Sequence, residues 1–153
     1  MRWLALLFVV ACADRPAPLV EGHRTGAGYW PENSAYGARE AMLQNLDGIE
    51  VDLVLTRDLV PVLHHDPAVS TEHCRMVDGG AVAENLWIRD LTYRDLQETV
   101  VCGGVALEAF PQAIVLEEPM LSFDRMLQLM REHSDAGQLI HLDIKQEPGV
   151  TLP

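Results

Sequence analysis

Two histidines and several carboxylates lie within one stretch of this sequence, and their types suit the cleavage of a phosphate ester. His23 precedes Arg24, the pair Glu50 and Asp52 follows, and His65 closes the stretch. Imidazole titrates near neutral pH, guanidinium matches phosphate oxygens, and paired carboxylates can hold a metal ion. Together these groups could perform metal-assisted acid–base cleavage of a phosphodiester.

The acidic pair lies on a segment that is predicted to be a strand. Residues 48–55 are mostly aliphatic, and because side chains alternate along a strand, Glu50 and Asp52 project from the same face. An acidic pair often marks a solvated face, but the apolar neighbours here favour burial. Two carboxylates in one cavity repel each other unless a cation lies between them, and Mg²⁺ and Ca²⁺ prefer oxygen ligands. We therefore expect a divalent cation at this pair.

A second predicted strand brings His65 beside the acidic pair. Residues 60–65 have a strand pattern, and the connection 56–59 is too short for a parallel crossover. The connection must therefore be a hairpin or a sharp bend. A turn centred on residues 57–58 sets Glu50 opposite His65.

The ordered motifs resemble those of the glycerophosphodiester phosphodiesterase family. The resemblance runs from about Leu19 to Lys145 and rests on His23-Arg24-Thr25-Gly26, Pro31-Glu32-Asn33-Ser34, Glu50-Val51-Asp52, Thr56-Arg57-Asp58, His65-Asp66 and Leu142-Asp143-Ile144-Lys145. The chain departs from the family pattern at a few places. The family usually has glutamate in place of Asp143, and glycine in place of Thr25 and Leu59.

This resemblance implies a fold, a reaction and a role for each residue of the site. The family has an α/β fold of the TIM-type (β/α) barrel kind, as in phospholipase C-like phosphodiesterases, and hydrolyses glycerophosphodiesters to an alcohol and glycerol phosphate with Ca²⁺ or Mg²⁺. The implied roles are acid–base catalysis by His23 and His65, phosphate binding by Arg24 and Lys145, and metal binding by Glu50, Asp52 and Asp143.

Two helices are predicted beside the strands. Asn33 or Ser34 can cap a helix that runs to about Asn45, with an apolar stripe expected in the core. The other helix follows Ser122, and its apolar residues recur at helical spacing, which is typical of a core face. These residues are Phe123, Met126, Leu127 and Met130.

The remaining histidines near these motifs have weaker functional signals. His64 points to the strand face opposite that of His65, where a hydrogen-bonded packing role is more common than catalysis. His141 shares a face with Asp143, so it is an outside candidate for the lining of the site. His73 lies in a polar loop and is expected at the surface.

The first residues resemble a bacterial lipoprotein signal. A short basic start leads into an apolar run that is too short to span a bilayer, and the run ends at Cys12. Residues 1–18 are therefore interpreted as a signal peptide and tether, with Cys12 lipidated. An ordinary secretory signal cleaved near Ala13, or an N-terminal strand, is the alternative. We expect an extracytoplasmic protein, periplasmic or on the cell surface, anchored to the bacterial membrane.

The other two cysteines fit that location. Cys74 and Cys102 could form a disulfide in an oxidising compartment, and two reduced, buried thiols are nearly as plausible. Both lie within about residues 70–118, which lack a clear period apart from a small helix opened by the capping box Thr92-x-x-Asp95. In the resembling family, an insertion at this place helps to shape the substrate pocket.

Composition and length set the outer limits. A formal net charge of -12 with 48% hydrophobic residues predicts an acidic globular domain and argues against binding to nucleic acid. A TIM-type barrel takes about 250 residues, whereas this chain has 153. Residues 19–153 are therefore expected to form only about the first half of a barrel. Two functions remain: a glycerophosphodiester hydrolase, or a truncated non-catalytic lipoprotein that at most binds phosphate groups.

Overall fold

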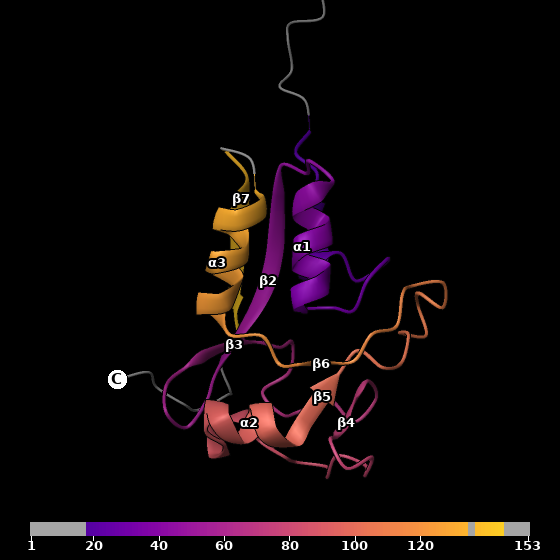
Figure 1. The fold of residues 1–153 in the computed structure, drawn as a ribbon, viewed down its shortest axis with the longest axis vertical. Coiled ribbons are helices and arrows are strands. Elements are labelled where there is room, and N and C mark those ends of the chain that lie inside the picture. The colour runs from indigo at the N-terminus through magenta and orange to yellow at the C-terminus, as the bar shows by residue number, and fades with distance from the viewer. Residues whose placement is uncertain (1–17, 135–136, 146–153) are drawn as a thin grey trace, which may run out of the picture.

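The chain forms two small sheets that lie one above the other, as Figure 1 shows. The computed structural model describes residues 18–134 and 137–145. In Figure 1 the upper sheet is flanked by the helices α1 and α3, and the lower sheet is accompanied by the helix α2. The residues that the sequence predicts to do chemistry belong to the upper sheet and to the segments that directly follow its strands.

Three of the four strands of the upper sheet are parallel and are joined by helices in β-α-β units. The central strand β2 (Gly48–Leu55) confirms the predicted bounds and lies between β1 (Glu21–Gly22) and β7 (Leu139–Ile144). The helix α1 (Ala35–Leu43) connects β1 to β2, and α3 (Phe123–His133) precedes β7. Each parallel connection therefore contains a helix, as such connections require.

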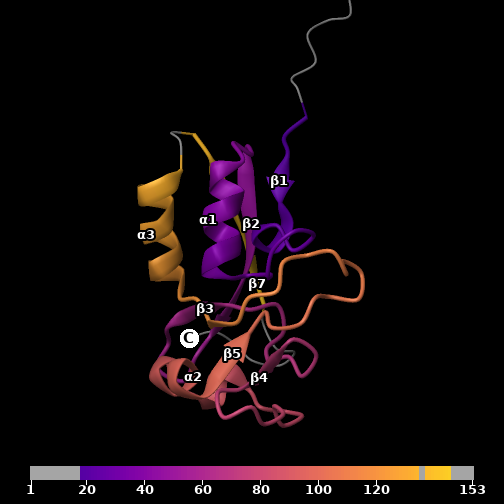
Figure 2. The same cartoon turned by 45° about the vertical axis from the view of Figure 1, so that its right-hand side comes forward.

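Both helices pack on the same face of this sheet (Figure 2). Because side chains alternate along β2, Ile49, Val51 and Leu53 point toward the helices and join the buried core. The helices contribute Ala38, Ala41, Met42, Met126 and Leu129 to that core. Glu50 and Asp52 are thereby directed to the opposite face, which is where a barrel of this kind has its interior.

Hydrogen bonds at the starts of the helices agree with the caps predicted from the sequence. Ser34, one of the two predicted caps, accepts a hydrogen bond at the start of α1, and Ser122 does so at the start of α3. The capping box of Thr92 and Asp95 is confirmed in α2. The helix α1 ends before the predicted Asn45, which has a left-handed backbone (φ 53°) that stops a helix.

The predicted hairpin is confirmed, but its register is wrong by one residue. The antiparallel strand β3 (Pro61–Leu63) places Leu63 opposite Leu53, and the amide of His64 donates to the carbonyl of Asp52. The reason lies in the turn, where Leu59 adopts a left-handed backbone (φ 63°) and adds a third residue to the loop. Glu50 therefore does not lie opposite His65.

The lower sheet comes almost entirely from the predicted insertion. Its strands β4 (Cys74–Met76), β5 (Val100–Cys102) and β6 (Glu118–Pro119) are antiparallel. The short helix α2 (Tyr93–Thr99) and the 3-10 turn η2 (Ile88–Asp90) precede β5. This layer has its own buried core, which the far end of β2 joins through Val54, so the two layers are packed together.

The parallel sheet is an open piece of a barrel. It contains the three parallel strands β1, β2 and β7, and β3 is an antiparallel arm on the end of β2. Within residues 18–134 and 137–145, no strand pairs with the outer edge of β7. Three apolar side chains of β7 are correspondingly exposed, namely Leu139, Leu142 and Ile144, while Ile140 packs against the core.

Candidate active site

Three carboxylates converge on the face of the sheet that α1 and α3 leave free. Glu50 and Asp52 project from β2, and Asp143 lies opposite Asp52 in the pairing of β2 with β7. One oxygen of each carboxylate lies within 4.8 Å of the others. Asp52 is only 1% exposed, whereas Asp143 lies on the exposed edge strand. The aspartate at position 143 thus reaches the cluster, although the resemblance predicts the longer glutamate there.

Asp52 is the most heavily contacted of these carboxylates. Lys145 Nζ lies 3.0 Å from Asp52 Oδ1 and 2.6 Å from Asp143 Oδ2, so it bridges the two strands. Asn33 Nδ2 donates to Asp52 Oδ2 at 2.8 Å, and Arg24 Nε lies 3.4 Å from the same oxygen. Burial alone would lower the pKa of Lys145, but its hydrogen bonds to the two aspartates raise that pKa.

Arg24 contacts three carboxylates, one through its main chain and two through its guanidinium. The main-chain amide of Arg24 donates to Glu50 Oε2 at 2.7 Å, which ties the loop after β1 to β2. Its Nη1 donates to Glu32 Oε2 at 3.0 Å. With Nε directed at Asp52, the guanidinium lies at the edge of the carboxylate cluster, where a phosphate could share it.

This loop adopts a strained backbone. Arg24 (φ 49°) and Thr25 (φ 61°) are both left-handed, a conformation that costs a non-glycine residue about 1–2 kcal/mol. Thr25 occupies a position where the family usually has glycine, and the structure keeps the conformation that glycine favours. The loop also requires Gly37 of α1, since a Cβ there would lie 2.8 Å from Thr25 Oγ1.

The two predicted catalytic histidines adjoin the carboxylate cluster from different loops. His23 Nε2 lies 3.9 Å from Glu50 Oε2, and the His23 side chain is 71% exposed. His65 Nδ1 lies 2.9 Å from Asp66 Oδ1. A proton on Nδ1 would then leave Nε2 free to exchange protons with a substrate.

The positive groups around Asp143 lower its pKa. A hydrogen bond from Lys145 lowers the pKa of Asp143, and the nearby charges of His65 and Arg24 lower that pKa further. An open cavity of about 570 Å³ lies beside this carboxylate and is lined by His23, Glu50 and residues of β7, including His141 and Asp143. The structure therefore gathers His23, His65, Arg24, Lys145 and the three carboxylates around one face.

Two residues at this face were not assigned from sequence. Asn33 makes a two-point contact with Asp52, because its Oδ1 also accepts the Asp52 amide at 3.2 Å. Glu32, which the sequence offers only as part of a motif, contacts Arg24 and His73. The sequence signal for both residues is the Pro31-Glu32-Asn33-Ser34 motif. Ser34 caps α1, so capping does not account for Glu32 and Asn33.

Glu32 is the most perturbed carboxylate at the site. It is 9% exposed, and His73 Nε2 lies 3.4 Å from its Oε1. Burial alone would raise the pKa of Glu32, but hydrogen bonds from His73 and Arg24 lower that pKa to about 2. The expectation that His73 lies at the surface is wrong, because its side chain is 15% exposed and packs against Glu32.

The remaining histidines fall into different surroundings. His64 is buried, its Nε2 accepts a hydrogen bond from the Ser70 amide at 3.1 Å, and burial lowers its pKa to about 4. This is the predicted packing role. His141 lines the open cavity, and its Nδ1 lies 2.8 Å from Glu21 Oε2.

The structure describes two of the three cysteines. Cys74 and Cys102 face each other on β4 and β5 and form a disulfide. Cys12, the predicted lipidation site, lies outside the described residues. Within the described part of the chain, every helix is too short or too polar to cross a bilayer.

The carboxylate cluster fits a hard divalent cation. Glu50, Asp52 and Asp143 offer only oxygen atoms, which is the donor set that Ca²⁺ and Mg²⁺ prefer. Lys145 Nζ bridges two of these side chains, so positive charge already balances this arrangement. Where a metal ion binds, Glu50, Asp52 and Asp143 are the residues that would hold it.

The partial α/β barrel and the acidic cluster with flanking histidines define a class of phosphodiesterases. Residues 23–151 match the glycerophosphoryl diester phosphodiesterase family. Because this match covers most of the chain, the protein belongs to that family.

Solved structures show the same fold. A glycerophosphoryl diester phosphodiesterase structure from Silicibacter pomeroyi superposes with a TM-score of 0.77 at 24% identity, covering 85% of this chain and 46% of that chain. An Oleispira antarctica phosphodiesterase, solved in complex with the product sn-glycerol-3-phosphate, has a TM-score of 0.61 at 23% identity and covers 84% and 44%. The chain thus spans less than half the length of these structures.

A curated relative matches a shorter segment. An uncharacterized protein from Sinorhizobium fredii is 33% identical over 66 residues, which is 43% of this chain and 18% of the relative.

Proposed function

We propose that the protein hydrolyses glycerophosphodiesters, the deacylated backbones of phospholipids, to an alcohol and glycerol phosphate. The convergence of Glu50, Asp52 and Asp143 beside Arg24 and Lys145 carries this proposal. An anionic diester needs positive groups at its phosphate, and in an acidic protein these groups must be local.

In this proposal each residue of the site has a separate role in the reaction. Arg24 grips the phosphate through its guanidinium, and Lys145 adds positive charge on the opposite strand. His23 and His65 act as the general acid and base, so one activates the attacking hydroxyl and the other protonates the leaving alkoxide. A divalent cation, when bound by Glu50, Asp52 and Asp143, supplies Lewis-acid polarisation of the phosphoryl oxygens.

We also propose that the protein works outside the cytoplasm, anchored through Cys12. The disulfide between Cys74 and Cys102 supports an oxidising compartment. Replacing Cys12 with serine should release the protein from the membrane fraction of expressing cells. Unchanged membrane association of Cys12→Ser would argue against this anchor.

The assay for the activity measures choline release from glycerophosphocholine. We expect turnover that requires a divalent cation and that falls at least 100-fold in His23→Ala, since general acid–base catalysis contributes about 10²–10⁴-fold. His133→Ala, in the last turn of α3, is the matched control and should retain activity. Phosphate binding without turnover would favour the alternative, a non-catalytic phosphate-binding lipoprotein.

A further inference from the structure

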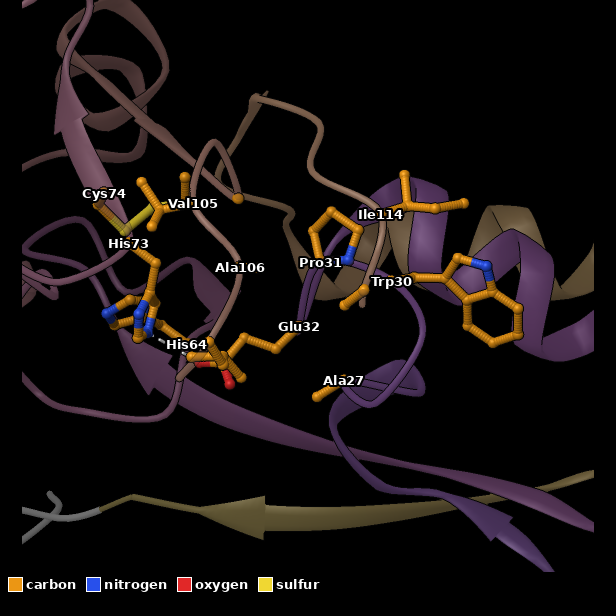
Figure 3. Close-up of a pocket in the computed structure, with 14 residues that line it drawn as sticks. Ala27, Trp30, Pro31, Glu32, His64, His73, Cys74, Val105, Ala106 and Ile114 are labelled. Carbon is orange, nitrogen blue, oxygen red and sulfur yellow. Dashed lines mark ion pairs between the residues drawn. A yellow bond between two sulfur atoms is a disulfide. The ribbon is translucent and has the colours of Figure 1, made fainter. Parts of the chain in front are cut away.

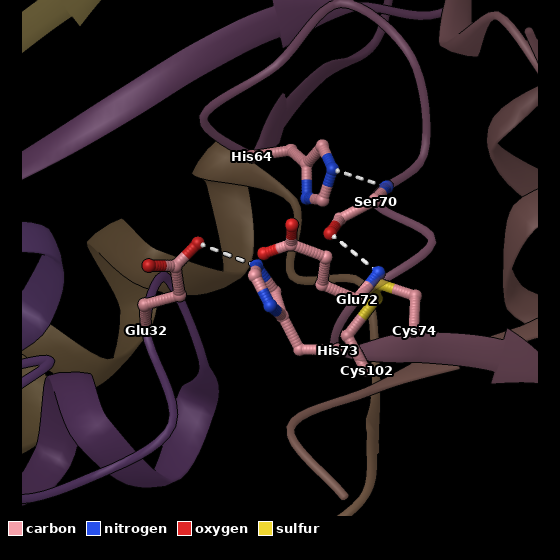
Figure 4. The surroundings of a disulfide bond; sticks show 7 residues. All are labelled: Glu32, His64, Ser70, Glu72, His73, Cys74 and Cys102. Carbon is pink, nitrogen blue, oxygen red and sulfur yellow. Dashed lines mark hydrogen bonds and ion pairs between the residues drawn. A yellow bond between two sulfur atoms is a disulfide. The ribbon is translucent and has the colours of Figure 1, made fainter. Parts of the chain in front are cut away.

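The lower sheet contacts the proposed site at one small area, next to the disulfide. His73, which directly precedes Cys74, is directed at Glu32, and Glu32 in turn binds Arg24. Figure 4 shows His73 between Glu32 and the disulfide. The Glu32 carboxylate thus connects His73, at the start of the lower sheet, to the guanidinium of Arg24.

A second contact holds the same two segments together. Gly103, which directly follows Cys102, packs against Pro31, since a Cβ at Gly103 would lie 2.8 Å from the Pro31 Cβ. The Gly103 amide also donates to the carbonyl of His73 at 2.9 Å. The residues beside both half-cystines therefore touch the Pro31-Glu32 segment, one through a side chain and the other through the main chain.

The contact between His73 and Glu32 is largely shielded from water, since these side chains are 15% and 9% exposed beside a small cavity. The cavity has a volume of about 30 Å³, and Glu32, His64 and His73 gather at one end of it, as Figure 3 shows. A hydrogen bond to a charged group is strongest where water is excluded. The Glu32 carboxylate accepts from both His73 and Arg24 here, so removal of His73 leaves the carboxylate with one fewer donor.

We propose that His73 is a positioning residue: with the Cys74–Cys102 disulfide it holds Glu32 so that Arg24 faces the phosphate. This inference rests on the proposed function, because it assigns Arg24 to the phosphate. The contact that links His73 to the site runs through Glu32. The disulfide joins β4, which His73 precedes, to β5, which Gly103 follows, and this link keeps both contacts in register.

The test compares His73→Ala, His73→Gln and the control His133→Ala. Each full-length variant is measured for its affinity for sn-glycerol 3-phosphate, and for KM and kcat with glycerophosphocholine. We expect His73→Ala to weaken binding and raise KM about tenfold, the equivalent of one hydrogen bond to a charged group, with kcat nearly unchanged. His73→Gln keeps a donor and should restore most of the affinity.

The disulfide is tested separately with the double variant Cys74→Ser and Cys102→Ser. It should weaken binding as His73→Ala does. Wild-type affinity in His73→Ala, or equal losses in His73→Ala and His73→Gln, would overturn the role of His73, and wild-type affinity in the double variant would overturn the role of the disulfide. Should His73→Ala fail to fold, affinity in His73→Gln and the double variant decides. A wild type that neither binds nor hydrolyses these compounds would instead refute the proposed function and remove the inference with it.

Discussion

Replacing Glu32 with glutamine should destabilise the protein in a manner that depends on pH. Its pKa is lowered from 4.5 to about 2 in the folded chain. Each pKa unit corresponds to about 1.4 kcal/mol, so the ionised form of Glu32 contributes on the order of 3 kcal/mol to the free energy of unfolding. Because the pKa is lowered on folding, this stability is fully present above pH 4.5 and is lost as the pH falls toward 2.

Urea unfolding measured at several pH values tests this reasoning. At pH 7, Glu32→Gln should unfold with about 3 kcal/mol less free energy than the wild type. The difference should shrink as the pH falls from 4.5 toward 2, because the wild type then protonates Glu32 as well. Glu84→Gln is the matched control, since Glu84 lies exposed in the lower layer. Equal stabilities at pH 7, or pH profiles that remain parallel below pH 4.5, would refute the account of Glu32.

Three further predictions concern the backbone, the disulfide and the buried carboxylate. Leu59→Gly should raise the free energy of unfolding by about 0.5–1 kcal/mol, because Leu59 is 68% exposed and left-handed; no gain in urea unfolding would contradict the strain argument. Reducing the disulfide should lower the free energy of unfolding by about 3–4 kcal/mol, given the sequence separation of 28 residues, and an unchanged thermal midpoint after reduction would count against this. Asp52→Asn should lower the hydrolysis rate at least 100-fold, because two cationic groups and the proposed metal lose their shared carboxylate; wild-type rates would exclude Asp52 from the site.

Much of the site could be predicted because it lies on neighbouring strands. The alternation of β2 alone places Glu50 and Asp52 on one face, and the motif at Asp143 and Lys145 lies on the strand that pairs with β2. The alternation follows from local sequence, whereas the place of Asp143 and Lys145 beside β2 was expected only from the family resemblance. The extent of β2 and the helix caps were also predictable from local sequence.

Two expectations were wrong, the hairpin register and the exposure of His73. Both depend on a backbone conformation or on a segment that is distant in the sequence. The register of the hairpin depends on the left-handed conformation of Leu59, which an aliphatic residue adopts rarely. The sign of it in the sequence is that the resembling family usually has glycine at this position. His73 was placed at the surface because its loop is polar, but its environment comes from Glu32, far away in the chain. Contacts of this kind depend on how the two layers pack, and local patterns do not encode that packing.

The most direct test of the central claim is a calorimetric titration of the protein with Ca²⁺ and with Mg²⁺. The account predicts that the wild type binds at least one of these ions and that Asp143→Asn weakens this binding at least tenfold. The variant should remain folded, since Asp143 lies on the exposed edge strand. Identical binding by the wild type and Asp143→Asn, or no binding by the wild type, would contradict a metal site built from the three carboxylates.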